Sequence, residues 1–167
     1  KRVCAILALL LVPGCTRHAM EILEVAATDT AGWAHDVTLN GDRLYLSDRQ
    51  GGYLVFQRST SWSRPQVFAP VADVISLAPH GGEPVLAARF EGLVWVSADG
   101  RVNTRYANGD IANAVATRGD LAFAAYGLHG LVIARLAKDG IQVISQLASS
   151  GWSHDVKLSR EEALLAD

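Results

Sequence analysis

The chain has 167 residues, half of them apolar, and a formal net charge of −2 at pH 7. This composition lies in the range of globular proteins and is sufficient for one modest core. Lys and Arg are scattered along the chain rather than clustered, which argues against nucleic acid or an anionic membrane surface as a partner.

The first fourteen residues have the pattern of a secretory signal peptide. Lys1 and Arg2 precede an apolar run from Val3 to Val12, and the small residue Gly14 follows. A short basic end, about ten apolar residues and a small residue before the cleavage point are typical of an exported precursor. The run is too short to span a bilayer, which needs roughly 20 residues. We therefore predict a signal peptide over residues 1–14.

The segment Val12-Pro13-Gly14-Cys15 resembles a bacterial lipobox. The resemblance implies that Cys15 is lipidated and that residues 15–21 form a tether in a protein of the bacterial cell envelope. The several acyl chains that this implies would anchor the protein stably, which a single chain does not. The residue after the cysteine is Thr16 and not Asp, which favours the outer membrane or the cell surface. The alternative is an ordinary signal peptide in which Cys15 occurs by chance.

Short strands separated by turns follow the tether. Residues 22–25 are predicted as the outer, closing strand of a blade. Residues 35–71 form the first full unit, in which the pair Asn40-Gly41 is a strong tight-turn signal. Its strands are predicted at residues 37–39, 43–47, 53–56 and 66–68.

The same four-strand order recurs in the units at residues 72–111 and 112–153. The second unit has predicted strands at 74–77, 84–88, 93–97 and 102–105, with its first hairpin widened between Pro79 and Pro84. The third has them at 114–117, 121–125, 131–135 and 141–145. The last unit, residues 154–167, has strands at 156–158 and 163–166. No helical period is sustained in the sequence.

The units are internal repeats. Gly32 to Val37 reads GWAHDV, and Gly151 to Val156 reads GWSHDV, 119 residues later. The unit starts Asp36, Asp73, Asn113 and Asp155 are spaced by 37, 40 and 42 residues. A period near 40 built from short strands predicts an all-β fold, a β-propeller with four-stranded antiparallel blades. The chain holds about three and a half blades and is expected to be part of a longer ring.

The third strand of each unit carries a further resemblance. Gly52-Tyr-Leu-Val-Phe56, Gly92-Leu-Val-Trp-Val96 and Gly130-Leu-Val-Ile133 resemble the LVIVD-repeat β-propeller family, over about residues 22–167. The usual Asp and Pro after this strand are replaced, for example by Gln57-Arg58. The resemblance implies a secreted or lipoprotein-type bacterial propeller, and it implies no particular chemistry.

Candidate site residues lie on one face of the predicted propeller. Two sets of loops share it, those that lead into the first strand of a blade and those that join the second strand to the third. Function concentrates on loops held by a rigid scaffold. The candidate ligand-binding residues in these loops are Trp33, His35, Asp36, Arg49, Arg89, Tyr126, His129, Trp152, His154 and Asp155.

Each candidate type has a structural alternative. His35 and His154 are weak candidates for acid–base catalysis, but adjacent residues on a strand point to opposite sides, so a His-Asp pair does not easily converge. The blade-start Asp and Asn residues are suited to bonding backbone amides. Trp33 and Trp152 suit either ligand stacking or packing between blades. We predict no metal and no cofactor.

The sequence favours a binding module over an enzyme, since no nucleophile or phosphate-binding motif is present. The predicted function is a cell-envelope or surface-anchored propeller that binds a protein or an extracellular ligand through its loop face. The membrane is contacted only through the lipid anchor. The alternative is an extracytoplasmic hydrolase or lyase that uses His and Asp at the propeller mouth.

Overall fold

The computed structural model describes residues 3–7, 24–59 and 61–167. The first blade contains β3 (Asp36–Asn40), β4 (Arg43–Ser47), β5 (Tyr53–Gln57) and β6 (Gln66–Phe68). The second contains β7 (Ser76–His80), β8 (Glu83–Ala87), β9 (Leu93–Val96) and β10 (Val102–Tyr106). The third contains β11 (Ala112–Arg118), β12 (Leu121–Tyr126), β13 (Gly130–Ala137) and β14 (Gly140–Leu147). The fourth sheet contains β15 (Asp155–Leu158) and β16 (Ala163–Ala166).

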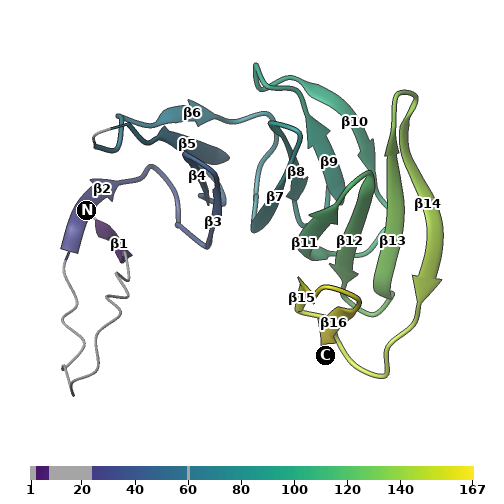
Figure 1. Cartoon of the computed structure of the whole chain (residues 1–167). Coiled ribbons are helices and arrows are strands. Elements are labelled where there is room, and N and C mark those ends of the chain that lie inside the picture. Colours follow the sequence, from purple (N-terminus) through teal and green to yellow (C-terminus); the bar gives the residue numbers. More distant parts are fainter. Residues whose placement is uncertain (1–2, 8–23, 60) are drawn as a thin grey trace, which may run out of the picture.

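Every blade is an antiparallel meander whose strands pair in chain order. The sheets follow one another along an open arc, with each first strand on the inner side and the fourth strand of a complete blade outside (Figure 1). The first strands β3, β7, β11 and β15 lie beside one another in sequence. The β-propeller with four-stranded blades, predicted from the period near 40, is confirmed as an incomplete ring of about three and a half blades.

Both faces of the middle strands are buried, and this holds the blades together. In β8, Leu86 packs toward the first blade, whereas Val85 and Ala87 pack toward the third. In β13, Val132 faces the second blade and Leu131 the fourth sheet. Successive residues of a strand point to opposite faces, so a run of consecutive apolar residues supplies two interfaces at once. The hydrophobic core is therefore a series of layers between sheets.

Polar side chains join the innermost strands across the layers. Ser47 Oγ donates to the carbonyl of Ile75 at 2.7 Å, and its side chain is fully buried. Thr38 Oγ1 donates to the carbonyl of Leu77 at 3.2 Å. The first strand is the inner edge of its blade and has no neighbouring strand of the same sheet on that side. These bonds satisfy backbone carbonyls at that edge.

The first hairpin of the second blade is tighter than the sequence suggests. A widened connection was expected between Pro79 and Pro84, but β7 and β8 continue to a two-residue turn at Gly81-Gly82, with φ of 57° and 95°. Pro79 and Pro84 face each other one pair before the turn. That pair exchanges no ladder hydrogen bonds in a two-residue hairpin, so two prolines are tolerated there.

The N-terminal part contains one further sheet. The strand β1 (Val3–Leu7) pairs antiparallel with β2 (Glu24–Asp29). Of the outer, closing strand expected at residues 22–25, the described residues 24 and 25 belong to β2, which pairs with β1 and not with a blade; its closing role stays a prediction. Residues 8–14 of the predicted signal peptide, and Cys15, lie outside the described residues. The signal peptide and the lipidated cysteine stay predictions. No helix in the described part of the chain is long and apolar enough to cross a membrane.

Candidate functional site

The loop face consists of residues 30–35, 69–75, 107–111 and 148–154, which lead into the first strands, and residues 48–52, 88–92 and 127–129, which join second to third strands. The antiparallel order of each blade places both sets at the same edge of the sheets. The hairpins between first and second strands, and between third and fourth, lie on the opposite face, called the hairpin face below.

A backbone bridge fixes each loop of the second set to the next blade. Arg49 pairs with Val74, and Arg89 pairs with Ala112. Gly127 occupies the equivalent position in the third blade and pairs with Ser153. All three loop residues have positive φ, of 36°, 38° and 30°. The two arginines therefore accept a backbone conformation that suits glycine better, and such strain at non-glycine residues is concentrated at functional sites.

Arg49 and Arg89 share one carboxylate, which belongs to Asp73. The Nε of Arg49 lies 3.0 Å from Asp73 Oδ1, and Nη1 of Arg89 lies 3.9 Å from Oδ2. All three side chains are between 25% and 30% exposed, so they reach the surface from a fixed backbone. Two cations on one anion leave the cluster with an excess positive charge. Arg89 Nε is buried and has no hydrogen-bond partner in the described structure.

Large apolar side chains are exposed on the same loop face. Phe90 follows Arg89 and is 69% exposed, and Leu128 occupies the equivalent position in the third blade and is 68% exposed. The guanidinium carbon of Arg89 lies 5.2 Å from the centroid of the Phe90 ring, a cation–π geometry. Trp33, in a loop that leads into the first blade, is 55% exposed. The loop face thus combines aromatic, aliphatic and arginine side chains.

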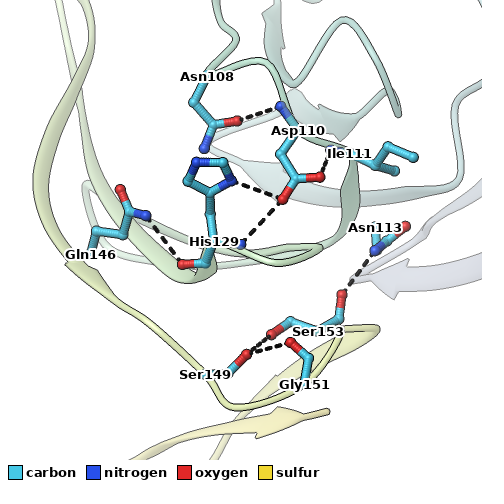
Figure 2. Close-up of polar contacts among 9 residues, drawn as sticks. All are labelled: Asn108, Asp110, Ile111, Asn113, His129, Gln146, Ser149, Gly151 and Ser153. Carbon is cyan, nitrogen blue, oxygen red and sulfur yellow. Dashed lines mark hydrogen bonds and ion pairs between the residues drawn. The ribbon is translucent and has the colours of Figure 1, made fainter.

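An Asp–His pair lies in the third blade (Figure 2). His129 Nδ1 lies 2.8 Å from Asp110 Oδ2, and the backbone N–H of His129 donates to the same oxygen at 3.1 Å. Asp110 Oδ1 accepts from the N–H of Ile111 at 2.7 Å. An ionised carboxylate only accepts hydrogen bonds, so Nδ1 carries a proton and Nε2 is the ring nitrogen that can accept one. Asn108 Oδ1 accepts from the N–H of Asp110 at 3.1 Å.

The surroundings of Asp110 favour its ionised form. Burial of the carboxylate opposes ionisation, but the hydrogen bond from the His129 ring and those from nearby backbone amides together outweigh it and lower the pKa of Asp110. The pair has the geometry of a base and its orienting carboxylate. Among the described residues, no hydroxyl or thiol is hydrogen-bonded to the His129 ring, so a nucleophile is not part of this arrangement.

The His-Asp pairs highlighted by the sequence are separated in the structure. Asp36 Oδ1 accepts from the N–H of Val37, and Oδ2 accepts from Ser76 Oγ at 2.9 Å. Asp155 Oδ1 likewise accepts from the adjacent amide of Val156. The backbone-amide bonds expected at these two positions are therefore present.

The other two blade-start residues have different partners. Asn113 donates to the carbonyl of Ser153 at 2.8 Å, and Asp73 binds the two arginines. His35 and His154 are exposed, and in the described part of the chain neither ring has an Asp partner. His35 directly precedes β3 and His154 directly precedes β15, so the two rings lie in loops of different blades.

Tyr126 does not reach the loop surface, although it was expected as a ligand contact. Its side chain is fully buried, and its hydroxyl bonds Leu93 N and Tyr106 O. Burial raises the pKa of Tyr126, so the hydroxyl stays neutral. Its role is structural because the hydroxyl both donates and accepts a hydrogen bond within the protein. Trp152 is partly buried, unlike the exposed Trp33.

Three residues of the loop face were not recognised from the sequence. They are Asp110, Phe90 and Leu128. A polar residue such as Asp110 is common in a loop and carries no signal, whereas exposed apolar residues such as Phe90 and Leu128 are unusual there. The available signal was the position of Phe90 and Leu128 directly after Arg89 and Gly127, where the repeat alignment predicts an exposed loop tip. In the part of the chain that the structure describes, no three His, Cys, Asp or Glu residues come together in a way that could hold a metal ion.

The comparisons with known proteins concern the fold. No family model and no curated protein sequence matches the chain. The structure of U3-55K is similar with a TM-score of 0.67 and 11% identity, over 83% of this chain and 47% of that one. The WD40 β-propeller domain of Doa1 is similar with a TM-score of 0.66 and 12% identity, over 83% and 50%. BamB from Moraxella catarrhalis gives a TM-score of 0.59 and 14% identity, over 80% and 41%.

The chain thus spans half or less of the length of these solved structures. At 11–14% identity the similarity concerns architecture and not a shared site. The arrangement of its sheets and these likenesses agree: the chain is a β-propeller repeat array.

Proposed function

We propose that this chain is a cell-envelope or surface-anchored binding module that holds a protein partner on its loop face. The observation that carries the proposal is the combination of exposed Phe90 and Leu128 with Arg49 and Arg89 on fixed loops of neighbouring blades. Aromatic residues and arginine dominate the energetics of protein interfaces. A rigid backbone reduces the entropy lost on binding.

The strain at the two arginines supports the same role. Gly127 shows that this fold accepts glycine at the equivalent position, yet the first and second blades carry Arg49 and Arg89 there. Each has a cost in conformational energy of order 1–2 kcal/mol. An advantage outside the folding of the chain explains why side chains of this type stand at strained positions. A carboxylate of the partner would neutralise the excess positive charge of Arg49 and Arg89.

A site-specific photo-crosslink tests the proposal. A benzophenone amino acid is placed at position 90 of the full chain, in its native envelope, and the irradiated adducts are compared with those from position 67. Val67 lies on the outer strand β6 and is 62% exposed, so it matches Phe90 in accessibility but not in location. We expect one discrete adduct from position 90 and none from position 67. The adduct should disappear when Arg49→Glu and Arg89→Glu are combined.

The proposal fails if both positions give the same adducts, or if position 90 gives none. It also fails if the adduct persists at full yield in the double arginine variant, because contact at position 90 would then be independent of the charged cluster. Thermal melting of each variant shows whether folding is intact.

The proposed anchor is Cys15, through the lipobox resemblance of residues 12–15. Cys15→Ser, or treatment with globomycin, is expected to leave an unprocessed precursor and to reduce the amount of mature protein bound to membranes. A precursor that is processed normally under both conditions would contradict lipidation.

The alternative function is that of a hydrolase or lyase. The Asp110–His129 pair favours it, since His129 Nε2 is placed to act as a base. An enzyme of this kind loses activity in His129→Gln with an unchanged melting temperature. His35→Ala and His154→Ala, at exposed rings with no Asp partner in the described structure, serve as matched controls.

A further inference from the structure

A groove on the hairpin face lies between the first and second blades. It has a volume of about 450 Å³ and is lined by side chains of β4 and β5, by the segment before β6, and by hairpin residues of the second blade such as Gly82 and Ala98. Pockets for small ligands typically measure about 300–1,000 Å³. The groove is thus of suitable size for a small molecule or the last residues of a peptide, and it lies away from the loop face.

The groove is positively charged. Arg43 and Arg64 line it, and its lining includes no carboxylate among the described residues. Nε of Arg43 donates to Gln57 Oε1 at 3.3 Å, an acceptor without charge. Two guanidinium groups that face one hollow without an acidic partner attract an anion, and their planar donors suit a carboxylate.

Acidic side chains of the neighbouring hairpins have other partners. Glu83 lines an adjoining hollow that shares Arg43, and its Oε2 is 3.5 Å from Asn103 Nδ2. Asp99, in the hairpin between β9 and β10, accepts from Ser97 Oγ and pairs with Arg101 at 3.3 Å. Both carboxylates therefore have partners of their own outside the groove.

A buried hydroxyl in the wall of the groove lacks a partner. Tyr45 is 2% exposed and lines the groove, and its Oη has no hydrogen bond in the described structure. A buried polar group without a partner costs about 1–3 kcal/mol. Because the hydroxyl is covered in this side-chain arrangement, a ligand reaches it only after side chains of the groove move. Arg43 and Arg64 are both exposed and can move in this way.

The same face of the first blade also supplies aromatic side chains to the groove. The rings of Tyr53 and Phe68 are stacked, with centroids 5.1 Å apart and an angle of 16° between their planes. Both residues line the groove. A flat aromatic surface beside cationic donors suits a ligand with an apolar body and an anionic end.

We propose that this groove binds a carboxylate that is attached to an apolar body. Arg43 and Arg64 bind the carboxylate, Tyr45 Oη donates a further hydrogen bond to it, and Tyr53 and Phe68 contact the apolar part. Two sources present this chemistry, a free aryl or alkyl acid and the C-terminal residue of a peptide.

Calorimetric titration of the full chain distinguishes these sources. The probes are N-acetyl-phenylalanine, its neutral amide, and a tetrapeptide that ends in phenylalanine with a free carboxylate. The acids are expected to bind at least about tenfold more tightly than the amide. Tighter binding of the tetrapeptide assigns the groove to peptide termini, and tighter binding of the single amino acid assigns it to free acids.

Matched variants locate the binding. Arg43→Ala combined with Arg64→Ala should abolish the preference for acid over amide, whereas Arg160→Ala, at an exposed arginine of the fourth sheet, should retain it. Tyr45→Phe should weaken binding of the acids severalfold without lowering the melting temperature, since the hydroxyl has no hydrogen-bond partner to lose in the part of the chain that the structure describes.

The proposal is overturned if the acid and its amide bind equally, if neither acid binds, or if the double arginine variant binds like the unmodified chain. Unchanged binding in Tyr45→Phe would remove the hydroxyl from the site. A lowered melting temperature in that variant would show that the hydroxyl has a structural role instead. The photo-crosslink at position 90 tests the loop face separately, so either proposal can fail alone.

Discussion

The hydroxyl of Tyr126 accepts a hydrogen bond from the backbone N–H of Leu93 at 2.8 Å, which ties the third blade to the second. The same hydroxyl donates to the carbonyl of Tyr106 at 2.9 Å. A single side chain thus satisfies two backbone groups of the neighbouring sheet. Propeller blades contact only their neighbours, so bonds of this kind contribute directly to the cohesion of the array.

Tyr126→Phe is expected to lower the free energy of unfolding by about 1–3 kcal/mol, because it leaves backbone polar groups of the second blade unpaired. Tyr45→Phe is the matched control. It removes the same atom from a tyrosine of similar burial whose hydroxyl has no hydrogen-bond partner among the described residues, and stability should stay constant or rise slightly. Urea denaturation of both variants measures the difference. Equal losses in the two variants would contradict a specific role for the Tyr126 bond.

Replacement of Arg49 separates backbone strain from the ion pair with Asp73. Arg49→Gly and Arg49→Ala both remove the ion pair, but only alanine retains a Cβ at a φ of 36°. The glycine variant should therefore be more stable than the alanine variant by about 1 kcal/mol. Denaturation midpoints of the two proteins give this difference. A more stable alanine variant would show that the loop relaxes without strain.

The Asp110–His129 pair predicts a pH dependence of stability. The pKa of Asp110 is lowered in the folded chain, so its contribution is fully present above the ordinary Asp value near 3.9 and is lost as the pH falls through the lower folded-state value. Asp110→Asn should reduce the melting temperature most at neutral pH. The difference from the unmodified chain should shrink as the pH falls below about 4.

Asp120→Asn is the control for this measurement. Asp120 forms an exposed ion pair with Arg135 at 3.1 Å, and such pairs contribute at most about 1 kcal/mol. Melting curves of all three proteins between neutral and acidic pH provide the comparison. A deficit in Asp110→Asn that grows toward low pH would contradict the assigned direction of the shift.

Local sequence signals were sufficient to place most of the strands. The strands β4 and β6 have the predicted bounds, because turn residues and apolar alternation define them within the chain itself. The predicted start of β7 at Val74 was two residues early. Val74 pairs with Arg49 of the preceding blade instead of continuing the ladder with β8, and no local pattern encodes a bridge between blades.

The site was less accessible to sequence reasoning than the fold. Asp110 and His129 are separated by 19 residues and lie in different loops of the third blade, so their contact depends on how β11 pairs with β12. By contrast, His35 and Asp36 are adjacent in sequence, yet the strand directs their side chains apart and Asp36 binds Ser76. Proximity along the chain was thus a poor guide to proximity in the site, whereas the position of a residue within the repeat was informative.

The glycine before the third strand of each blade is predicted to be the most sensitive small residue of the repeat. Gly92 has a φ of 78°, and a Cβ at this position would lie 2.1 Å from the carbonyl oxygen of Tyr106 and 2.9 Å from Tyr126 Oη. A Cβ added at Gly52 or Gly130 would likewise lie 2.1 or 2.2 Å from a backbone oxygen at the end of the outer strand of the same blade. Backbone atoms cannot rotate away, so a side chain here separates the third and fourth strands.

Gly92→Ala is therefore expected to destabilise the protein by about 2–5 kcal/mol, the sum of positive-φ strain and steric displacement of the outer strand. Gly109→Ala is the control, since Gly109 has a φ of 84° but a Cβ added there would meet no described atom within 4 Å, and it should lose only about 1–2 kcal/mol. Chemical denaturation of both variants measures the difference. If the two losses are equal, the close approach of Gly92 to Tyr106 is relieved at no cost, and the glycine of the Gly-Leu-Val pattern is required for its backbone conformation alone.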